Sequence, residues 1–308
     1  MDLRSESSRL INVALATNTT NAYNTGLNSF EKFRTVYSIL KDWPPSIDTI
    51  ALFIAWLSLQ GLKDSTARLY INAIGFQCKI RGCNDISRNF VVQKALEGLK
   101  RSVRRNSLRL PITQVLLKGI LGALQNVCSN EYETRLFTAA YCLAFFGFLR
   151  VSELVATNRS NTGFVIMKSD IIIDGSGESL LLVIRHSKND QHGHGAQLKL
   201  CRTGTQICPV LSVQRFLLQR PFINGPLLCH LDGAPLTRYQ FSAILKRCLS
   251  RLGLQYDRYT SHSFRIGAAT AAAVAGYPPD VIQRAGRWRS DAYHIYIRPD
   301  SVITLPKL

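Results

Sequence analysis

Residues 261–298 read SHSFRIGAATAAAVAGYPPDVIQRAGRWRSDAYHIYIR, and this stretch decides how the rest of the chain is interpreted. His262 and Arg265 lie three residues apart at the predicted start of a helix, so their side chains share one face. Gly286-Arg287-Trp288 follows, and then Tyr296. A lone His-x-x-Arg pair more often belongs to a surface helix with an ion pair, so this motif needs support from elsewhere.

Two further segments supply that support. Residues 148–154 read FLRVSEL and place Arg150 in an apolar run, where a guanidinium is costly to bury unless its charge meets an anion. Glu153 is the nearest partner, and a structural Arg–Glu pair is the plainer interpretation. Lys188 lies in the polar turn RHSKNDQ, residues 185–191, where lysine side chains are usually solvated.

The first third of the chain reads as helices. Asn18 to Thr20 supply capping residues for a first helix, and Pro44-Pro45 ends it. The further predicted helices span residues 47–59 after a Ser46 cap, residues 64–82, and a stretch from residue 87 to the basic cluster near residue 105.

The remainder mixes helices with a short β-rich region. Thr113 is the predicted cap of one helix, residues 131–146 form the next, and the hydrophobic period then changes from helical to alternating. Predicted strands span residues 164–173, 179–186 and 196–201, with Asp174 to Gly177 as a hairpin turn; helices return at residues 209–219, 237–252, 262–275, 278–285 and 291–297. The fold class is therefore mainly α with a small antiparallel β-sheet.

Length and charge fit two domains and a polyanionic partner. The chain has 308 residues and a formal net charge of +18. Residues 1–107 contribute a net +7 and residues 108–308 a net +11, so both predicted domains are basic. A basic surface on both halves indicates nucleic acid as the partner.

Metal and membrane chemistry are not expected. The eight cysteines form no Cys-x-x-Cys pair, and several lie in apolar helical patterns where a thiol packs as a small hydrophobe. His192 and His194 lie in a polar, glycine-containing turn and are not expected to bind metal. No apolar segment has the length of a signal or a membrane span, so we expect a soluble intracellular protein without a metal or nucleotide cofactor.

The ordered set of motifs resembles one family. GFLRVSEL (residues 147–154), SKNDQ (187–191) and GRWRSDAY (286–293) together are similar to the tyrosine recombinase, or phage-integrase, family over nearly the whole chain. The nearest similarity is to the eukaryotic Crypton-type mobile-element recombinases. The resemblance implies an N-terminal helical, SAM-like core-binding domain in residues 1–107 and a tyrosine recombinase catalytic domain in residues 108–308.

The resemblance also implies a metal-free reaction that cuts and rejoins DNA. Two arginines can fork onto the non-bridging oxygens of a phosphodiester and neutralise its charge. A tyrosine then attacks phosphorus, which leaves a 3′-phosphotyrosyl link, and a lysine protonates the departing 5′ oxygen. The implied catalytic residues are Arg150, Lys188, His262, Arg265, Trp288 and Tyr296, with Glu153 supporting the first arginine.

Two assignments stay open within this set. Trp288 lies eight residues before Tyr296 and Arg287 lies nine, and the longer spacing is usual in the family. We favour Trp288 because a shorter turn accounts for the difference. Tyr293 is the rival nucleophile, and we favour Tyr296 because Tyr-Ile-Arg matches the family's ending.

The expected partner is double-stranded DNA, held by four protomers on two recombination sites. The predicted DNA-contacting residues are Lys94, Lys100, Arg101, Arg104, Arg105 and Arg287. The basic cluster near residue 105 is equally consistent with a solvated helix end. A non-catalytic DNA-binding derivative and a type IB topoisomerase are the competing functions. The expected location is the nucleus for a eukaryotic protein and the cytoplasm or nucleoid otherwise.

Overall fold

The computed structural model describes residues 2–102, 109–160, 162–163, 165–185 and 195–298 of the chain. The chain divides into two compact units, Met1–Asn106 and Ser107–Leu308. Each unit has its own cluster of buried apolar side chains, so each is stabilised by its own interior.

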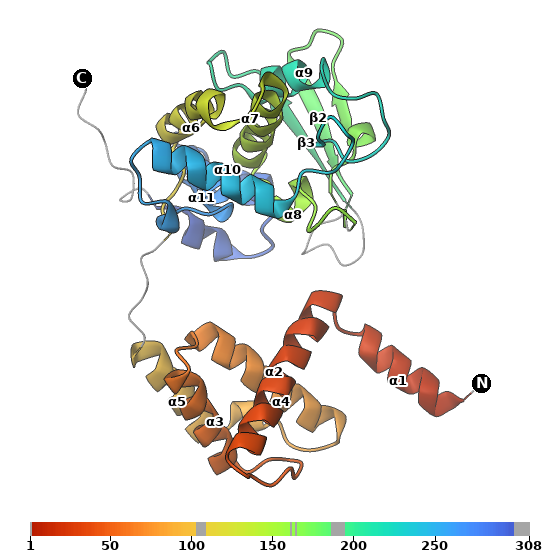
Figure 1. Cartoon of the computed structure of the whole chain (residues 1–308), viewed down its shortest axis with the longest axis vertical. Coiled ribbons are helices and arrows are strands. Elements are labelled where there is room, and N and C mark those ends of the chain that lie inside the picture. The colour runs from red at the N-terminus through yellow and green to blue at the C-terminus, as the bar shows by residue number, and fades with distance from the viewer. Residues whose placement is uncertain (1, 103–108, 161, 164, 186–194, 299–308) are drawn as a thin grey trace. The chain divides into compact units, whose positions relative to one another are not determined.

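The described part of the first unit is helical (Figure 1). Its elements are α1 (Leu3–Val13), α2 (Thr17–Val36), α3 (Ile47–Leu59), α4 (Asp64–Ile80), the 3-10 turn η1 (Ile86–Arg88) and α5 (Phe90–Ser102). Phe30, Phe53 and Ile71 are fully buried where α2, α3 and α4 meet. Ser46 caps α3 as predicted, because its hydroxyl accepts the backbone N–H of Thr49 at 3.1 Å.

Two helix starts in this unit differ from the prediction, and one helix is an addition to it. Residues 18–20 lie inside α2, whose N-cap is Ala16 without a side-chain hydrogen bond. The helix predicted from residue 87 begins at Phe90, because the carboxylate of Asp85 accepts the backbone N–H of Ser87 and closes η1 first. The helix α1 was not predicted, and it buries no continuous apolar stripe that the sequence pattern would reveal.

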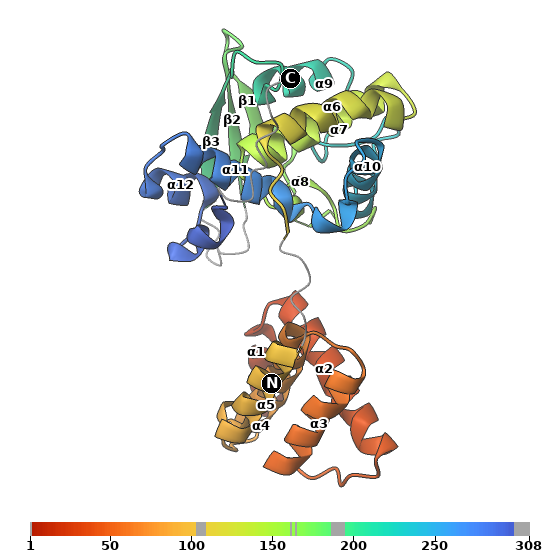
Figure 2. The same cartoon turned by 90° about the vertical axis from the view of Figure 1, so that its left-hand side faces the viewer.

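The second unit packs helices on a small sheet, as its fold class predicts (Figure 2). Its helices are α6 (Gln114–Val127), α7 (Glu131–Phe146), α8 (Val151–Leu154), α9 (Pro209–Leu217), α10 (Arg238–Arg251), α11 (His262–Val274) and α12 (Pro279–Gly286). Its strands are β1 (Ile171–Ile173), β2 (Ser179–Ile184) and β3 (Ala196–Cys201), and its 3-10 turns are η2 (Lys168–Asp170), η3 (Tyr256–Arg258) and η4 (Asp291–Tyr296).

The sheet is antiparallel, and β2 lies between β1 and β3. The strand predicted over residues 164–173 is wrong in length, since only Ile171–Ile173 pair with β2. The carboxylate of Asp170 accepts the backbone N–H of Met167 at 2.9 Å, and this contact folds the preceding residues into η2.

The helix α7 holds the second unit together through contacts with α6, α9 and α11. The Tyr141 ring lies 4.8 Å from the Phe241 ring of α10 and 5.1 Å from the Phe264 ring of α11. Its hydroxyl donates to the Phe241 carbonyl at 3.0 Å, which satisfies the one polar group on a buried side chain. These contacts fix α7, α10 and α11 against one another, so the end of α7 has a set position relative to the start of α11.

None of the described helices has the length and apolar character needed to cross a membrane. Across the same described ranges, no three His, Cys, Asp or Glu side chains come together as a metal site. His192 and His194 lie outside the described residues.

A glycine substitution in α11 tests the packing of that helix, and a glycine substitution in α6 is its control. A Cβ on Gly267 would lie 1.8 Å from the carbonyl oxygen of Ile112, whose backbone N–H is bonded to Ser263 at 3.0 Å. We expect Gly267→Ala to lower the free energy of unfolding by about 1–3 kcal/mol. Gly122→Ala in α6 meets nothing within 4 Å and should raise it by about 0.5–1 kcal/mol. Urea unfolding measures the free energy of unfolding of both variants. Changes of the same sign in the two variants would contradict the close contact at Gly267.

Candidate active site

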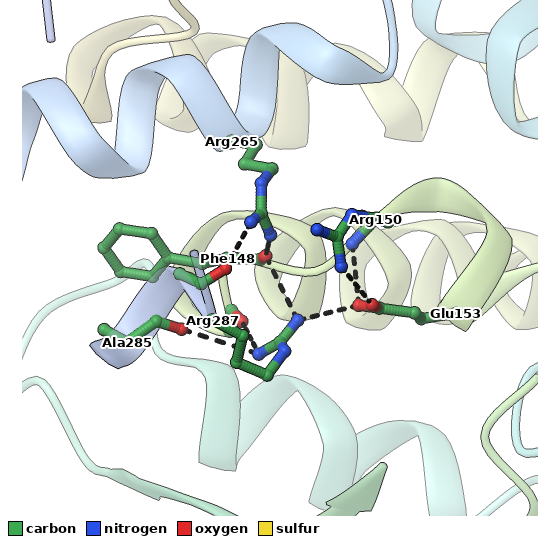
Figure 3. A network of polar contacts seen from close by, with 8 residues as sticks. Phe148, Arg150, Glu153, Arg265, Ala285 and Arg287 are labelled. Atoms are coloured by element: carbon green, nitrogen blue, oxygen red, sulfur yellow. Dashed lines mark hydrogen bonds and ion pairs between the residues drawn. The ribbon is translucent and has the colours of Figure 1, made fainter. Parts of the chain in front are cut away.

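Side chains from separate segments of the second unit converge beside the end of α7, and Figure 3 shows part of this group. They come from the α7–α8 junction, from the start of α11, from the residues after α12 and from η4. The residues are Arg150 and Glu153, then His262 and Arg265, then Arg287 and Trp288, and finally Tyr296.

The α7–α8 junction sets the position of Arg150. Gly147 ends α7, and Phe148 adopts a left-handed backbone conformation with φ of 49°. The buried Glu153 carboxylate then accepts the Arg150 backbone N–H at 2.9 Å and its guanidinium at 3.2 Å. The Arg150 side chain is 18% exposed, so a buried carboxylate anchors a cation that solvent or a ligand can reach.

Arg265 is the most deeply buried cation of the group, with 1% of its surface exposed. Its guanidinium donates to the backbone carbonyls of Phe148 and Gly286, and its Nε has no hydrogen-bond partner among the described residues. The guanidinium carbon lies 4.3 Å from the centroid of the Trp288 ring. Neutral acceptors and an aromatic face hold this side chain without neutralising its charge.

The site therefore carries an excess of positive charge. Burial and the neighbouring guanidiniums of Arg150 and Arg287 lower the pKa of Arg265, while Glu153 opposes that shift. An arginine retains its proton even so, because its ordinary pKa is so high. One carboxylate beside three buried or partly buried guanidiniums leaves a net charge that favours an anion.

His262 is neutral at pH 7. Burial first, and then the charges of Arg265, Arg109, Arg150 and Arg298, lower the pKa of its imidazole to about 4. The imidazole ring lies 4.9 Å from the Tyr296 ring. A neutral imidazole keeps one nitrogen free to accept a proton, which a cationic one does not.

Tyr296, rather than Tyr293, lies beside the histidine and the arginine. The Tyr296 ring lies 4.9 Å from the Trp288 ring, and the Arg265 guanidinium carbon is 5.8 Å from its centroid. Tyr293 is 4% exposed and packs in a small apolar cluster with Trp288, Ala269 and Ile282, whereas Tyr296 is partly exposed.

The contacts of the residues after α12 decide between Trp288 and Arg287 as the residue that lies beside Tyr296. The Trp288 ring is tilted against both tyrosines, 6.3 Å from the Tyr293 ring and 4.9 Å from the Tyr296 ring, while the Arg287 guanidinium contacts Glu153 at 2.7 Å. Gly286 makes this possible, because a Cβ on it would lie 1.6 Å from the Trp288 ring. The geometry therefore puts Trp288, and not Arg287, beside the tyrosine.

The remaining predicted residues belong to the first unit or lie outside the described residues. Lys188, Arg104 and Arg105 are outside the described residues. Lys94, Lys100 and Arg101 are exposed on α5 in the other compact unit, and Lys94 pairs with Glu97 at 2.9 Å. Their roles stay predictions.

Sequence reasoning missed three contributors to the site. The Phe148 carbonyl accepts hydrogen bonds from Arg265 and Arg287, and no side-chain pattern reveals a backbone acceptor. Arg109 and Arg298 both act on the pKa of His262, and the Arg298 guanidinium donates to the Arg109 carbonyl. Arg298 follows the Tyr-Ile dipeptide in sequence, which was the available signal.

A group of two arginines, a histidine and a tyrosine with an excess of positive charge suits an enzyme that transfers a phosphoryl group to tyrosine. The sequence pattern of the phage integrase family matches residues 112–301. The chain therefore belongs to the phage integrase family of tyrosine recombinases, as the motifs predicted.

Individual relatives agree with this assignment. An integrase/recombinase XerD homologue of Selenomonas ruminantium is 24% identical over 96% of this chain and 85% of its own length. The solved XerH recombinase bound to difH after cleavage has a TM-score of 0.66 at 14% identity, over 90% of this chain and 75% of that one. The lambda integrase dimer bound to a core site has a TM-score of 0.64 at 17% identity, over 100% of this chain and 80% of that one. The Tn1549 transposon integrase in complex with transposon-end DNA has a TM-score of 0.65 at 16% identity, over 93% of this chain and 92% of that one. The three structures share the fold of this chain.

The depressed pKa of His262 predicts a pH dependence of stability. The folded imidazole protonates near pH 4 and the unfolded one near its ordinary value of 6.5, so the unfolded state binds more protons between these values. The contribution of His262 to the free energy of unfolding should therefore fall as pH drops from 6.5 toward 4. Unfolding of the native protein and of His262→Gln, compared at pH 7 and pH 5, measures it. A difference between the two proteins that does not change with pH would contradict the neutral imidazole.

Proposed function

We propose that this protein is a site-specific DNA recombinase that cleaves and rejoins strands through a 3′-phosphotyrosyl intermediate on Tyr296. The observation that carries the proposal is the packing of Tyr296 against His262 and Trp288, with the Arg265 guanidinium carbon 5.8 Å from the phenol ring. A nucleophile, a proton acceptor and an uncompensated cation are thereby gathered in one place.

Arg150 and Arg265 are the proposed ligands of the scissile phosphate. Each can donate to a non-bridging oxygen and stabilise the charge that builds on the pentacoordinate transition state. Neutral backbone acceptors already hold the Arg265 guanidinium in place, and at 1% exposure it contacts a phosphate once the neighbouring side chains move aside. A donor fixed in advance in this way contributes about 10²–10³ in rate.

The proton transfers follow from the charge states. His262 is neutral and adjacent, so it can accept the phenol proton as the Tyr296 oxygen attacks phosphorus. The bond from phosphorus to the 5′ oxygen breaks, and by family resemblance Lys188 donates a proton to that oxygen. The phosphotyrosyl ester preserves the bond energy, so a 5′-hydroxyl from another strand can reverse the step without ATP or a metal.

Double-stranded DNA is the proposed partner. The net charge of +18 supports it, as do the DNA complexes formed by XerH, lambda integrase and the Tn1549 integrase. Lys94, Lys100 and Arg101 on α5 are exposed and available for backbone phosphates. Assembly of four protomers on two sites is part of the same proposal.

Membership of the Crypton-type branch is a finer proposal that rests on GFLRVSEL (residues 147–154), SKNDQ (187–191) and GRWRSDAY (286–293). The relatives described above include a bacterial protein, a phage integrase and a transposon integrase. A nuclear location follows only if the branch assignment holds.

Formation of a covalent adduct tests the function. The protein is incubated with a nicked suicide substrate built from the DNA that flanks its gene, and the products are resolved on a denaturing gel. We expect an adduct with the native protein and with Tyr293→Phe, and none with Tyr296→Phe, which should still bind DNA. An adduct with Tyr296→Phe but not with Tyr293→Phe would place the nucleophile on Tyr293.

Two other outcomes separate the competing functions. Specific binding of DNA by the native protein without any adduct would indicate a non-catalytic derivative. Relaxation of supercoiled plasmid without sequence preference would indicate a topoisomerase.

A further inference from the structure

Arg287 has a backbone conformation that its residue type rarely adopts. It ends α12 with φ of 53° and ψ of 43°, in the left-handed region where glycine is the usual residue. Such a conformation costs roughly 1–2 kcal/mol for a residue with a side chain and persists only when its surroundings hold it. The contacts of the Arg287 side chain are therefore the place to look for a reason.

The guanidinium of Arg287 is directed into the protein, and its side chain is 12% exposed. One terminal nitrogen donates to the Glu153 carboxylate at 2.7 Å and to the Phe148 carbonyl at 3.4 Å. The other donates to the Gly147 carbonyl at 3.3 Å and to the Ala285 carbonyl at 3.5 Å. Its donors are thus engaged mainly by the α7–α8 junction, on which Arg150 is mounted.

Two of the four acceptors described for Arg287 also hold the two phosphate-binding arginines (Figure 3). Glu153 binds Arg287 through one oxygen while the other accepts the Arg150 guanidinium at 3.2 Å. The Phe148 carbonyl accepts Arg287 and Arg265 together. Arg287 is therefore bonded to an anchor of each of the other two arginines.

This sharing has an electrostatic consequence. Burial and the charge of Arg150 lower the pKa of Arg287, and Glu153 opposes that shift. Because Glu153 is divided between two cations, it does not cancel the charge of Arg150. Without Arg287, the buried carboxylate would belong to Arg150 alone, and Arg150 would offer less charge to a phosphate.

We propose that Arg287 is a positioning residue for phosphoryl transfer, which acts through Glu153 and the Phe148 carbonyl and does not touch DNA. The proposal rests on the function proposed above, and it replaces the direct DNA contact expected of Arg287 from the sequence. A lysine would supply the charge but not the planar fork that reaches acceptors on two sides.

The test separates cleavage from binding in Arg287→Met and Arg287→Lys. Single-turnover cleavage of the suicide substrate is measured with the protein in saturating excess, and DNA affinity is measured over a range of salt. We expect Arg287→Met to cleave about a hundredfold more slowly, with affinity and salt dependence unchanged. Arg287→Lys should recover part of the rate.

Arg284→Met is the matched control. Arg284 lies on the same helix, is 76% exposed and pairs only with Asp280 among its described ion-pair contacts, so its loss should leave cleavage unchanged. Thermal unfolding of each variant confirms that it is folded under the assay conditions.

A double-mutant cycle with Glu153→Gln tests the route of action. If Arg287 acts through Glu153, the double variant should cleave no more slowly than the slower single variant. A purely structural role would lower the unfolding temperature without this coupling in the cleavage rate.

Three results would overturn the proposal. These are a loss of affinity with a shallower salt dependence in both Arg287 variants, an unchanged cleavage rate, and rate losses that multiply in the double variant. Failure of the proposed function has a different signature, because the native protein would then form no adduct, and the positioning role would fail with it.

Discussion

Burying a guanidinium is costly unless an anion balances its charge. The second unit is organised around a buried guanidinium, that of Arg265, whose charge is not balanced in this way. Arg265 is 1% exposed, and among the described residues its guanidinium donates hydrogen bonds to backbone carbonyls. Arg150 and Arg287 are its neighbouring cations, and the Glu153 carboxylate is already bonded to both of them. Under the proposed function, the phosphate of a DNA backbone supplies the missing charge.

The fold holds these uncompensated positive charges in place, and doing so lowers the local stability. The Tyr141 contacts fix α7, α10 and α11, so the fold holds Arg150 and Arg265 in place despite the repulsion between their charges. Left-handed backbone at Phe148 and Arg287 then brings both residues to the same place, where the Phe148 carbonyl joins the network. Strain at these two residues is consistent with a site that is organised before substrate arrives.

Local signals in the sequence predicted much of the fold, and tertiary contacts account for what they missed. The predicted helix at 131–146 and strand at 196–201 agree with α7 and β3, since capping and alternation act within a few residues. Motif order likewise predicted the family and the residues that gather around Tyr296. The partner of Arg287 is Glu153, which lies far away in sequence, and its left-handed backbone depends on that contact. No sequence pattern near Gly286-Arg287-Trp288 predicts the contact with Glu153 or the left-handed backbone. The predicted length of the first strand is wrong for a similar reason.

The most direct test is a structure of the Tyr296→Phe variant bound to intact duplex DNA that carries its recombination site. The account predicts that Arg150 and Arg265 each donate to a non-bridging oxygen of the scissile phosphate, with the ring of residue 296 on the side opposite the 5′ oxygen. A scissile phosphate held by other cations, with Arg265 still bonded only to the Phe148 and Gly286 carbonyls, would contradict it.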